Sequence, residues 1–318
     1  MLKKIFISAV LILAVLSFVV SLLKGNNNAE KTVTVPDRVA VINIYGTIIS
    51  GADSKDNIFS QTNGVTSGSI MKQIREAAAD DSVKALVLCI DSGGGSATAA
   101  EEVGRELKRF KEKTKKPIVA TIGNTGASAA YWIAVCASDK VYANATTLTG
   151  SIGVYMPYMN TEELFKKIGI TSNKIKSGPY KDIMSSDRPM TPEEQAILQN
   201  IVNEIYEQFV TTVAVGRKME ESKVKSLADG RVYTGLQAKN LGLVDEIGDY
   251  YDALAAAGEL GKIKPGADGL PPVKAKEKQQ PWEFLLSAHI AELIKTELVN
   301  QLTGSLQQSG APAGGMTR

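Results

Sequence analysis

Short apolar runs alternate with longer helical patterns from Arg38 to about Lys262, and this alternation is the strongest constraint on the fold. Runs such as 38–44 and 83–90 predict buried strands, and the amphipathic stretches between them predict helices. Strands that alternate with helices along a chain build α/β domains around a sheet. The sequence therefore predicts a single α/β domain over residues 37–262, with shorter segments on both sides.

Within this domain the same patterns place the remaining elements. The long helix that begins near residue 191 has the clearest boundary, because Thr191 suits the cap position and Pro192 the first helical position. The strand from residue 117 is expected to end at Gly123-Asn124. The other predicted strands are 140–143 and 172–175, and the other predicted helices are 69–79, 98–112, 129–135 and 161–168.

The N-terminus carries an uncharged run from Ile5 to Leu23, which predicts a membrane anchor over residues 1–24. As a helix this run measures about 28 Å, close to the bilayer core of about 30 Å. It exceeds the apolar region of a signal peptide, although a cleaved signal peptide is the alternative. Basic residues on both sides of the run leave its orientation open. Residues 25–36 are polar and are expected to form a tether.

Three further segments follow the domain. Residues 263–281 contain Lys264-Pro265-Gly266 and Pro271-Pro272, which predict a linker. Residues 282–303 have apolar side chains at helical spacing among acidic ones, which predicts an amphipathic helix packed on the body or on a neighbouring subunit. Residues 304–318 have the composition of a disordered tail.

Composition excludes several classes of function. A net charge of +2 gives no reason to expect nucleic acid as a partner, and the basic cluster at 108–116 suits the end of a helix. Cys89 and Cys136 lie in apolar patterns and are expected to be buried free thiols. Two cysteines and one histidine cannot build a usual zinc site, so we expect neither a metal nor another cofactor.

Ser128 is the first candidate for chemistry. It lies between the apolar strand from residue 117 and the apolar helix 129–135, where helix N–H groups and the positive end of the helix dipole converge. Small neighbours, Gly126-Ala127 and Ala129-Ala130, leave room for a substrate backbone. The alternative is that Ser128 only caps the helix.

The glycine run 92–96 is the second candidate, because a glycine-rich turn at a strand end exposes backbone N–H groups to an anion. It could form an oxyanion hole or a plain flexible turn. A phosphate loop is excluded, because neither the Gly-Lys-Ser/Thr ending nor the dinucleotide glycine spacing is present.

A nucleophilic serine requires a base. The only histidine, His289, lies beyond the predicted linker, whereas Lys181 follows the turn Ser177-Gly178-Pro179-Tyr180. An amine accepts a proton only when neutral, and lysine ordinarily has a pKa of about 10.4, so the fold must desolvate such a base. Lys181 is either this base or an ordinary surface lysine at a turn.

Several motifs recur in one order and make residues 38–262 resemble the signal peptide peptidase A family, in its short single-domain form. They are Asp91-Ser92-Gly93-Gly94-Gly95, Ala127-Ser128-Ala129-Ala130-Tyr131, Leu148-Thr149-Gly150-Ser151-Ile152-Gly153-Val154, Ser177-Gly178-Pro179-Tyr180-Lys181-Asp182-Ile183-Met184-Ser185, Asp229-Gly230-Arg231-Val232-Tyr233-Thr234-Gly235, Gln237-Ala238-Lys239 and Leu243-Val244-Asp245-Glu246-Ile247-Gly248. The resemblance implies a serine peptidase with the repeated β-β-α superhelix of Clp protease and crotonase enzymes.

The resemblance also implies a role for each site residue. Ser128 would be the nucleophile and Lys181 the general base, with Ser151 orienting the lysine. The N–H groups of Gly94 and Ala129 would form the oxyanion hole. The implied protein is a homo-oligomer in the bacterial cytoplasmic membrane, with one span and an extracytoplasmic catalytic domain that degrades cleaved signal peptides and other apolar peptides.

Two departures from the family pattern are present. Asp91 and Gly93 stand where the family usually has Asn and Pro, so the oxyanion loop is expected to be less rigid. Ala129-Ala130 adds methyl groups where the family usually has Gly-Gly or Gly-Ala, and this could narrow the pocket. A weak or inactive membrane-tethered scaffold, or a crotonase-like enzyme acting on an acyl thioester, are the alternatives.

Overall fold

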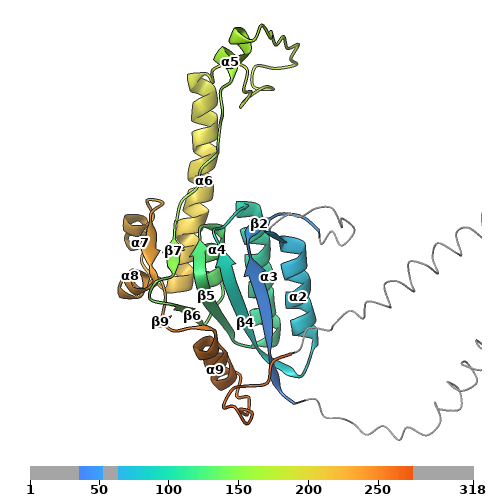
Figure 1. The fold of residues 1–318 in the computed structure, drawn as a ribbon, viewed down its shortest axis with the longest axis vertical. Coiled ribbons are helices and arrows are strands. Elements are labelled where there is room, and N and C mark those ends of the chain that lie inside the picture. Colours follow the sequence, from blue (N-terminus) through green and yellow to red (C-terminus); the bar gives the residue numbers. More distant parts are fainter. Residues whose placement is uncertain (1–35, 53–63, 275–318) are drawn as a thin grey trace, which may run out of the picture. The chain divides into compact units, whose positions relative to one another are not determined.

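A mostly parallel sheet forms the centre of the protein (Figure 1). The computed structural model describes residues 36–52 and 64–274. Parallel pairing runs in the order β1 (Arg38–Tyr45), β4 (Val83–Ser92), β5 (Ile118–Ala127), β6 (Lys140–Ala143) and β9 (Glu246–Ile247). The short β7 (Leu148–Gly150) continues beside the end of β5, and β8 (Val232–Thr234) pairs with it antiparallel. The predicted α/β fold is confirmed.

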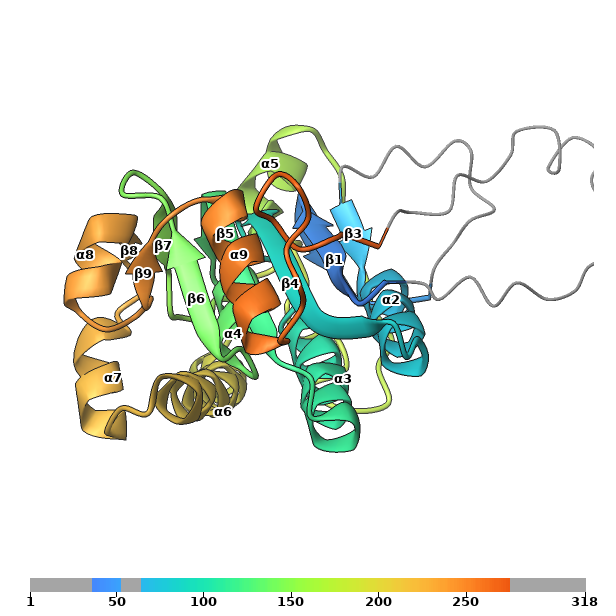
Figure 2. The same cartoon turned by 90° about the horizontal axis from the view of Figure 1, so that it is seen from below.

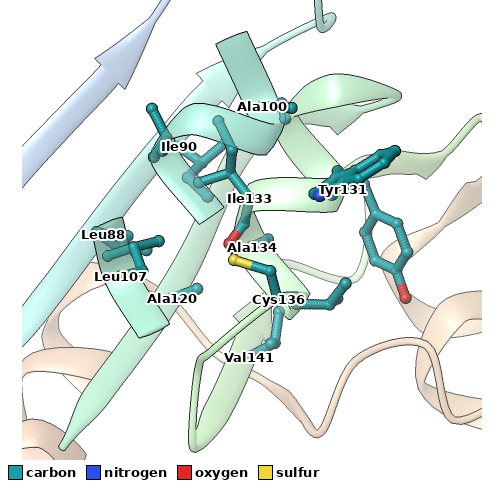
Figure 3. Packing of buried hydrophobic residues seen from close by; sticks show 14 of the residues in the cluster. Leu88, Ile90, Ala100, Leu107, Ala120, Tyr131, Ile133, Ala134, Cys136 and Val141 are labelled. Carbon is teal, nitrogen blue, oxygen red and sulfur yellow. Dashed lines mark hydrogen bonds between the residues drawn. The ribbon is translucent and has the colours of Figure 1, made fainter. Parts of the chain in front are cut away.

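Helices cover both faces of the sheet, as Figure 2 shows for α9 (Tyr250–Leu260) on one side and α3 (Ala97–Thr114) on the other. Successive residues of a strand point to opposite faces of the sheet, so Val87 packs toward α9 and Leu88 toward α3. Figure 3 shows Leu107 of α3 beside Leu88. Strands buried on both faces need apolar residues at nearly every position, which explains why their runs were readable in the sequence.

The larger of the two cores also contains α2 (Ser67–Ala79), α4 (Ala129–Val135) and the C-terminal half of α6 (Pro192–Arg217). Trp132 of α4 packs on Phe209 of α6 with ring centroids 4.9 Å apart. A Cβ placed on Gly216 would lie only 2.1 Å from the carbonyl oxygen of Val135, so α6 and α4 are in direct backbone contact here. The remaining elements are β2 (Thr47–Ile49), β3 (Gly64–Thr66), α5 (Glu162–Lys167), α7 (Glu221–Leu227) and α8 (Gly235–Asn240).

Helix α6 begins where the sequence predicted. The Thr191 side chain accepts from the Glu194 N–H, the Glu194 side chain accepts from the Thr191 N–H, and Pro192 occupies the first turn. From the core the helix projects past the end of the sheet, and α5 lies near its far end (Figure 1). We call residues 154–190, which connect β7 to α6 through α5, the arm.

Two sequence expectations about strands are wrong. Strand β5 does not end at Gly123-Asn124 but continues to Ala127. Polar contacts hold this extension, because the Asp91 carboxylate accepts from the Thr125 N–H at 3.0 Å and the Thr147 hydroxyl donates to the Gly123 carbonyl. Residues 172–175 form no strand, since they lie exposed in the arm without a partner strand among the described residues.

Other expectations are confirmed. Cys89 and Cys136 are buried and free, and burial raises the pKa of Cys89 to about 11 and that of Cys136 to about 12. Lys111 and Lys113 occupy the last turn of α3, where cations oppose the helix dipole.

Both ends of the described body meet at the start of the sheet. Val39 pairs with Val273, and Arg38 and Lys274 both contact the Asp80 carboxylate, at 3.0 and 2.8 Å. Residues 263–274, expected as part of a linker, therefore belong to the folded body. The predicted anchor, tether, amphipathic helix and tail lie outside the described residues. Among the helices that are described, none has the length and apolarity needed to cross a bilayer.

Candidate active site

Ser128 occupies a sharp turn between β5 and α4 with an unusual backbone conformation, φ 54° and ψ −125°. Residues other than glycine rarely adopt this region, and such strain costs on the order of 1–3 kcal/mol. The turn is held on both sides, because the Ser128 N–H donates to the Gly150 carbonyl at 2.9 Å and its carbonyl accepts from the Trp132 N–H at 3.0 Å. A strained strand-turn-helix of this kind presents a nucleophile in many hydrolases.

The Ser128 side chain does not cap α4. No hydrogen bond joins its hydroxyl to the first turn of the helix, which overturns the simple capping role considered above. The hydroxyl is therefore available to chemistry, since Ser128 lines a pocket of about 580 Å³.

The pocket has walls from four parts of the chain. The glycine loop and the residues after β7 form two walls, α6 forms the third, and the segment before β8 forms the fourth. Its lining residues are Gly93, Gly95, Ser128, Ser151, Gly153, Val154, Tyr155, Gln199, Val202, Asn203, Tyr206, Ala228, Asp229 and Gly230. Nothing in the sequence indicated the contribution of α6, because the strip of residues that faces the pocket is short and mixes polar with apolar side chains.

Ser151 lies close to Ser128 because of strand pairing. Ala127 and Gly150 are register partners in β5 and β7, so the residues that follow them enter the same pocket. Ser151 also has a positive φ of 49°, and its N–H donates to the Arg231 carbonyl at 2.9 Å. The backbone at this position is therefore fixed, and the side chain borders the space in front of Ser128.

Gly94 packs directly against Ser128. A Cβ built on Gly94, whose φ is +108°, would lie 2.8 Å from the Ser128 Cβ and 3.1 Å from the Ala129 nitrogen. The first N–H of α4, on Ala129, has no protein acceptor among the described residues. Gly94 therefore packs closely on the turn that carries Ser128 and on the first backbone nitrogen of α4.

The Gly94 N–H is not free, however. It donates to the hydroxyl of Ser92 at 3.1 Å, and Ser92 is itself buried. The Ile48 N–H holds the Gly94 carbonyl at 2.9 Å, which fixes the peptide on the other side. No pattern in the sequence indicates this contact. Asp91, one of the departures, accepts from the Thr125 N–H; an asparagine oxygen could make the same bond, so this contact does not explain the change.

Lys181 does not lie in this pocket. It is exposed in the arm, and its neighbour Asp182 is joined through Arg188 to Glu194 in the first turn of α6. No lysine or histidine is among the described residues that line the pocket. Asp229 is the ionised group at the rim, and hydrogen bonding from Arg231 lowers the pKa of its carboxyl. One copy of the chain therefore brings Ser128, Ser151, Gly94 and Ala129 together, but not Lys181.

Comparisons with known proteins agree with this architecture. A model of peptidase family S49 matches residues 110–264. A putative protease from Synechocystis sp. is 41% identical over 72% of this chain and 76% of its own length. A putative signal peptide peptidase from Enterococcus faecium is 35% identical over 76% of each chain. Protease 4 of Salmonella typhi is 38% identical over 71% of this chain and 35% of its own length.

Proposed function

This chain belongs to peptidase family S49, and from that premise we propose that it is a serine endopeptidase with Ser128 as its nucleophile. The observation that carries the proposal is the strained backbone of Ser128, whose hydroxyl makes no cap and borders a pocket. Strain of this kind persists where the surrounding structure holds a residue for function.

Lys181 is the proposed general base. Its neutral amine takes the proton from Ser128 Oγ as the oxygen attacks the peptide carbonyl, and the ammonium then returns a proton to the leaving amine. A water molecule then attacks the ester carbonyl while the Lys181 amine takes its proton. The ammonium returns that proton to Ser128 Oγ as the C–O bond breaks, which frees the serine. Ser151, beside Ser128, would orient the amine.

The N–H groups of Ala129 and Gly94 would stabilise the oxyanion of the tetrahedral intermediate. Gly94 must then turn its N–H from Ser92 toward the substrate, or share it. Gly94→Ala tests whether the close fit of this loop on Ser128 is needed, because the added Cβ would collide with Ser128. We expect a loss of peptidase activity of about 100-fold or more, because a displacement of about 1 Å at a reacting group can cost that much.

The dyad would form between copies of the chain, since within one copy Lys181 lies in the arm. The arm carries exposed apolar side chains, with Tyr155 84%, Met159 73% and Ile168 58% exposed. An apolar surface of this kind is suited to contact with another protein. We propose a homo-oligomer in which the arm of one copy covers the pocket of its neighbour and supplies a desolvated amine.

The proposed substrates are cleaved signal peptides and other apolar peptides at the bacterial cytoplasmic membrane. The name of the Enterococcus faecium relative supports this class, as does the uncharged run from Ile5 to Leu23. That run would anchor the protein by a single span, with the catalytic domain on the extracytoplasmic side. The repeated β-β-α superhelix is likewise proposed for the α/β core.

The test uses the full chain in mild detergent and an apolar fluorogenic peptide. Ser128→Ala and Lys181→Ala should each abolish hydrolysis. Two matched variants of exposed residues outside the arm, Ser226→Ala and Lys108→Ala, should retain it. Equal rates in all variants would leave only the inactive scaffold or the thioester enzyme.

Mixed oligomers test whether the dyad crosses copies. Co-expressed Ser128→Ala and Lys181→Ala chains would pair an intact serine with an intact lysine at some sites, so activity should return. If both single variants are inactive and the mixture is too, the two groups do not come from different copies.

A further inference from the structure

Helix α6 links the pocket to the turn that holds Lys181. Gln199 and Tyr206 line the pocket, and the C-terminal half of the helix is packed on α4 beside Ser128. Pro192, the first residue of α6, lies about two turns, or roughly 10 Å, before Gln199. The N-terminal turn of α6 is thus a fixed reference point for whatever is attached to it.

Arg188 attaches the Lys181 turn to that point. Its Nε and Nη2 atoms donate to the two oxygens of Asp182, both at 2.9 Å, and Asp182 directly follows Lys181. On its other side, Nη1 donates to Glu194 Oε2 at 2.8 Å, and Nη2 reaches the second oxygen of Glu194. One guanidinium therefore joins the residue next to Lys181 to the first turn of α6.

The carboxylates at both ends of this link are well shielded. The Glu194 side chain is 2% exposed and that of Asp182 11%, and Glu194 also accepts from the Thr191 N–H. The pKa of Glu194 is lowered to about 2, and that of Asp182 lies well below its ordinary range. In both cases hydrogen bonding from Arg188 is the largest cause. Removing the arginine would leave Glu194 shielded without its charged partner.

Other charges in the arm support Asp182 but do not replace this link. Lys176 donates to Asp182 Oδ1 at 2.7 Å, and Lys174 lies 3.8 Å from Oδ2 and binds Asp187. Both lysines belong to the arm, so their bonds link one part of the arm to another and do not connect the arm to α6. Arg188 also belongs to the arm, but its second partner, Glu194, belongs to α6.

We propose that Arg188, anchored on Glu194, is a positioning residue. It holds Lys181 beside the first turn of α6, the position from which Lys181 serves as the general base. The inference rests on the proposed Ser-Lys mechanism. Successive Cα atoms are 3.8 Å apart, so fixing Asp182 fixes the backbone from which the Lys181 side chain starts. A displacement of about 1 Å at a reacting group can cost about 100-fold in rate.

The central test compares Arg188→Gln with Arg75→Gln in the full chain in detergent. Arg75 is a matched control, because it also makes two bonds to a shielded carboxylate, Glu106, but on α2 and α3. Arg188→Gln should lower kcat on the fluorogenic peptide by about 10- to 100-fold and leave KM within about twofold. Arg75→Gln should change neither.

The pH profile separates positioning from support of the fold. A displaced amine keeps more water and holds its proton more tightly, so the acid limb of kcat in Arg188→Gln should move to higher pH. Arg188→Lys keeps the charge without the two-pronged geometry and should lie between Arg188→Gln and wild type. It also replaces Arg188→Gln as the deciding variant if the latter does not fold by circular dichroism.

Failure of this inference is distinguishable from failure of the mechanism. If Lys181→Ala keeps wild-type activity, the mechanism itself is wrong. If Lys181→Ala is inactive but Arg188→Gln matches Arg75→Gln, or loses kcat with an unchanged pH profile, only the positioning role is overturned. Where Lys181→Ala leaves a measurable rate, adding Arg188→Gln should lower it no further, and an independent loss would contradict the proposal.

Discussion

Replacing Ser128 with glycine should give a more stable protein than replacing it with alanine, although glycine usually weakens a fold. Both changes remove the same hydroxyl, which forms no cap bond to α4, so their difference isolates the Cβ. At φ 54° and ψ −125° a Cβ costs on the order of 1–3 kcal/mol. Glycine loses about 0.5–1 kcal/mol through the greater freedom of its unfolded chain.

The free energy of unfolding of the Ser128→Gly variant should therefore be about 0.5–2 kcal/mol higher than that of the Ser128→Ala variant. For a body of this size, that difference raises Tm by about 1–8 °C. Thermal unfolding of the two full-length variants measures it directly. Both lack the proposed nucleophile, so self-cleavage by it cannot bias the comparison.

A control fixes the ordinary effect of the same exchange. Ala255→Gly lies exposed in the middle of helix α9 and should lower stability by about 1 kcal/mol, the usual penalty for glycine in a helix interior. If Ser128→Gly melts at or below Ser128→Ala, as Ala255→Gly does relative to wild type, the backbone of Ser128 is not strained and the reasoning fails.

Three further outcomes are expected. Gly216→Ala should lower the free energy of unfolding by about 1–3 kcal/mol, because the added Cβ would meet the Val135 carbonyl. Alanine has the better helix propensity, so a variant that is more stable in urea unfolding would refute this contact. Tyr131→Phe should cost about 1–2 kcal/mol, because the buried hydroxyl donates to the Leu243 carbonyl at 2.7 Å, and an unchanged urea midpoint would contradict that. Glu194 has its pKa lowered from 4.5 to about 2, so its stabilising effect is complete above pH 4.5 and is lost as pH falls from 4.5 to about 2. Wild-type Tm should therefore fall more steeply than that of Glu194→Gln over this range, and parallel curves would exclude the effect.

Much of the fold was readable from the sequence because its signals are local. The runs that form β1 and β4 are mostly apolar, and Thr191, Pro192 and Glu194 form a start signal for α6 within four residues. The extension of β5 through Gly123 was not readable, since it depends on a contact from Asp91, distant in sequence. Residues 172–175 have strand-like composition, but none of the strands in the described parts of the chain pairs with them.

The site was only partly predictable for the same reason. Ser128 and Ser151 have recognisable surroundings, but their proximity results from the register of β5 on β7, which no local pattern encodes. The bond from Gly94 to Ser92 depends on a glycine conformation that sequence cannot specify. The place of Lys181 depends on where a 26-residue helix points, and that depends on packing between α4 and α6.

The meeting of Arg38 and Lys274, the two ends of the described body, at Asp80 bears on how a substrate would reach the site. Strands β1, β4 and β5 all begin at that edge, and Ser128 follows the far end of β5. Strand β4 alone spans about 30 Å between the two edges. The residues before Arg38 thus join the body at the edge opposite to Ser128, so if they form the proposed anchor, a peptide would have to reach the far edge of the sheet to meet the proposed nucleophile.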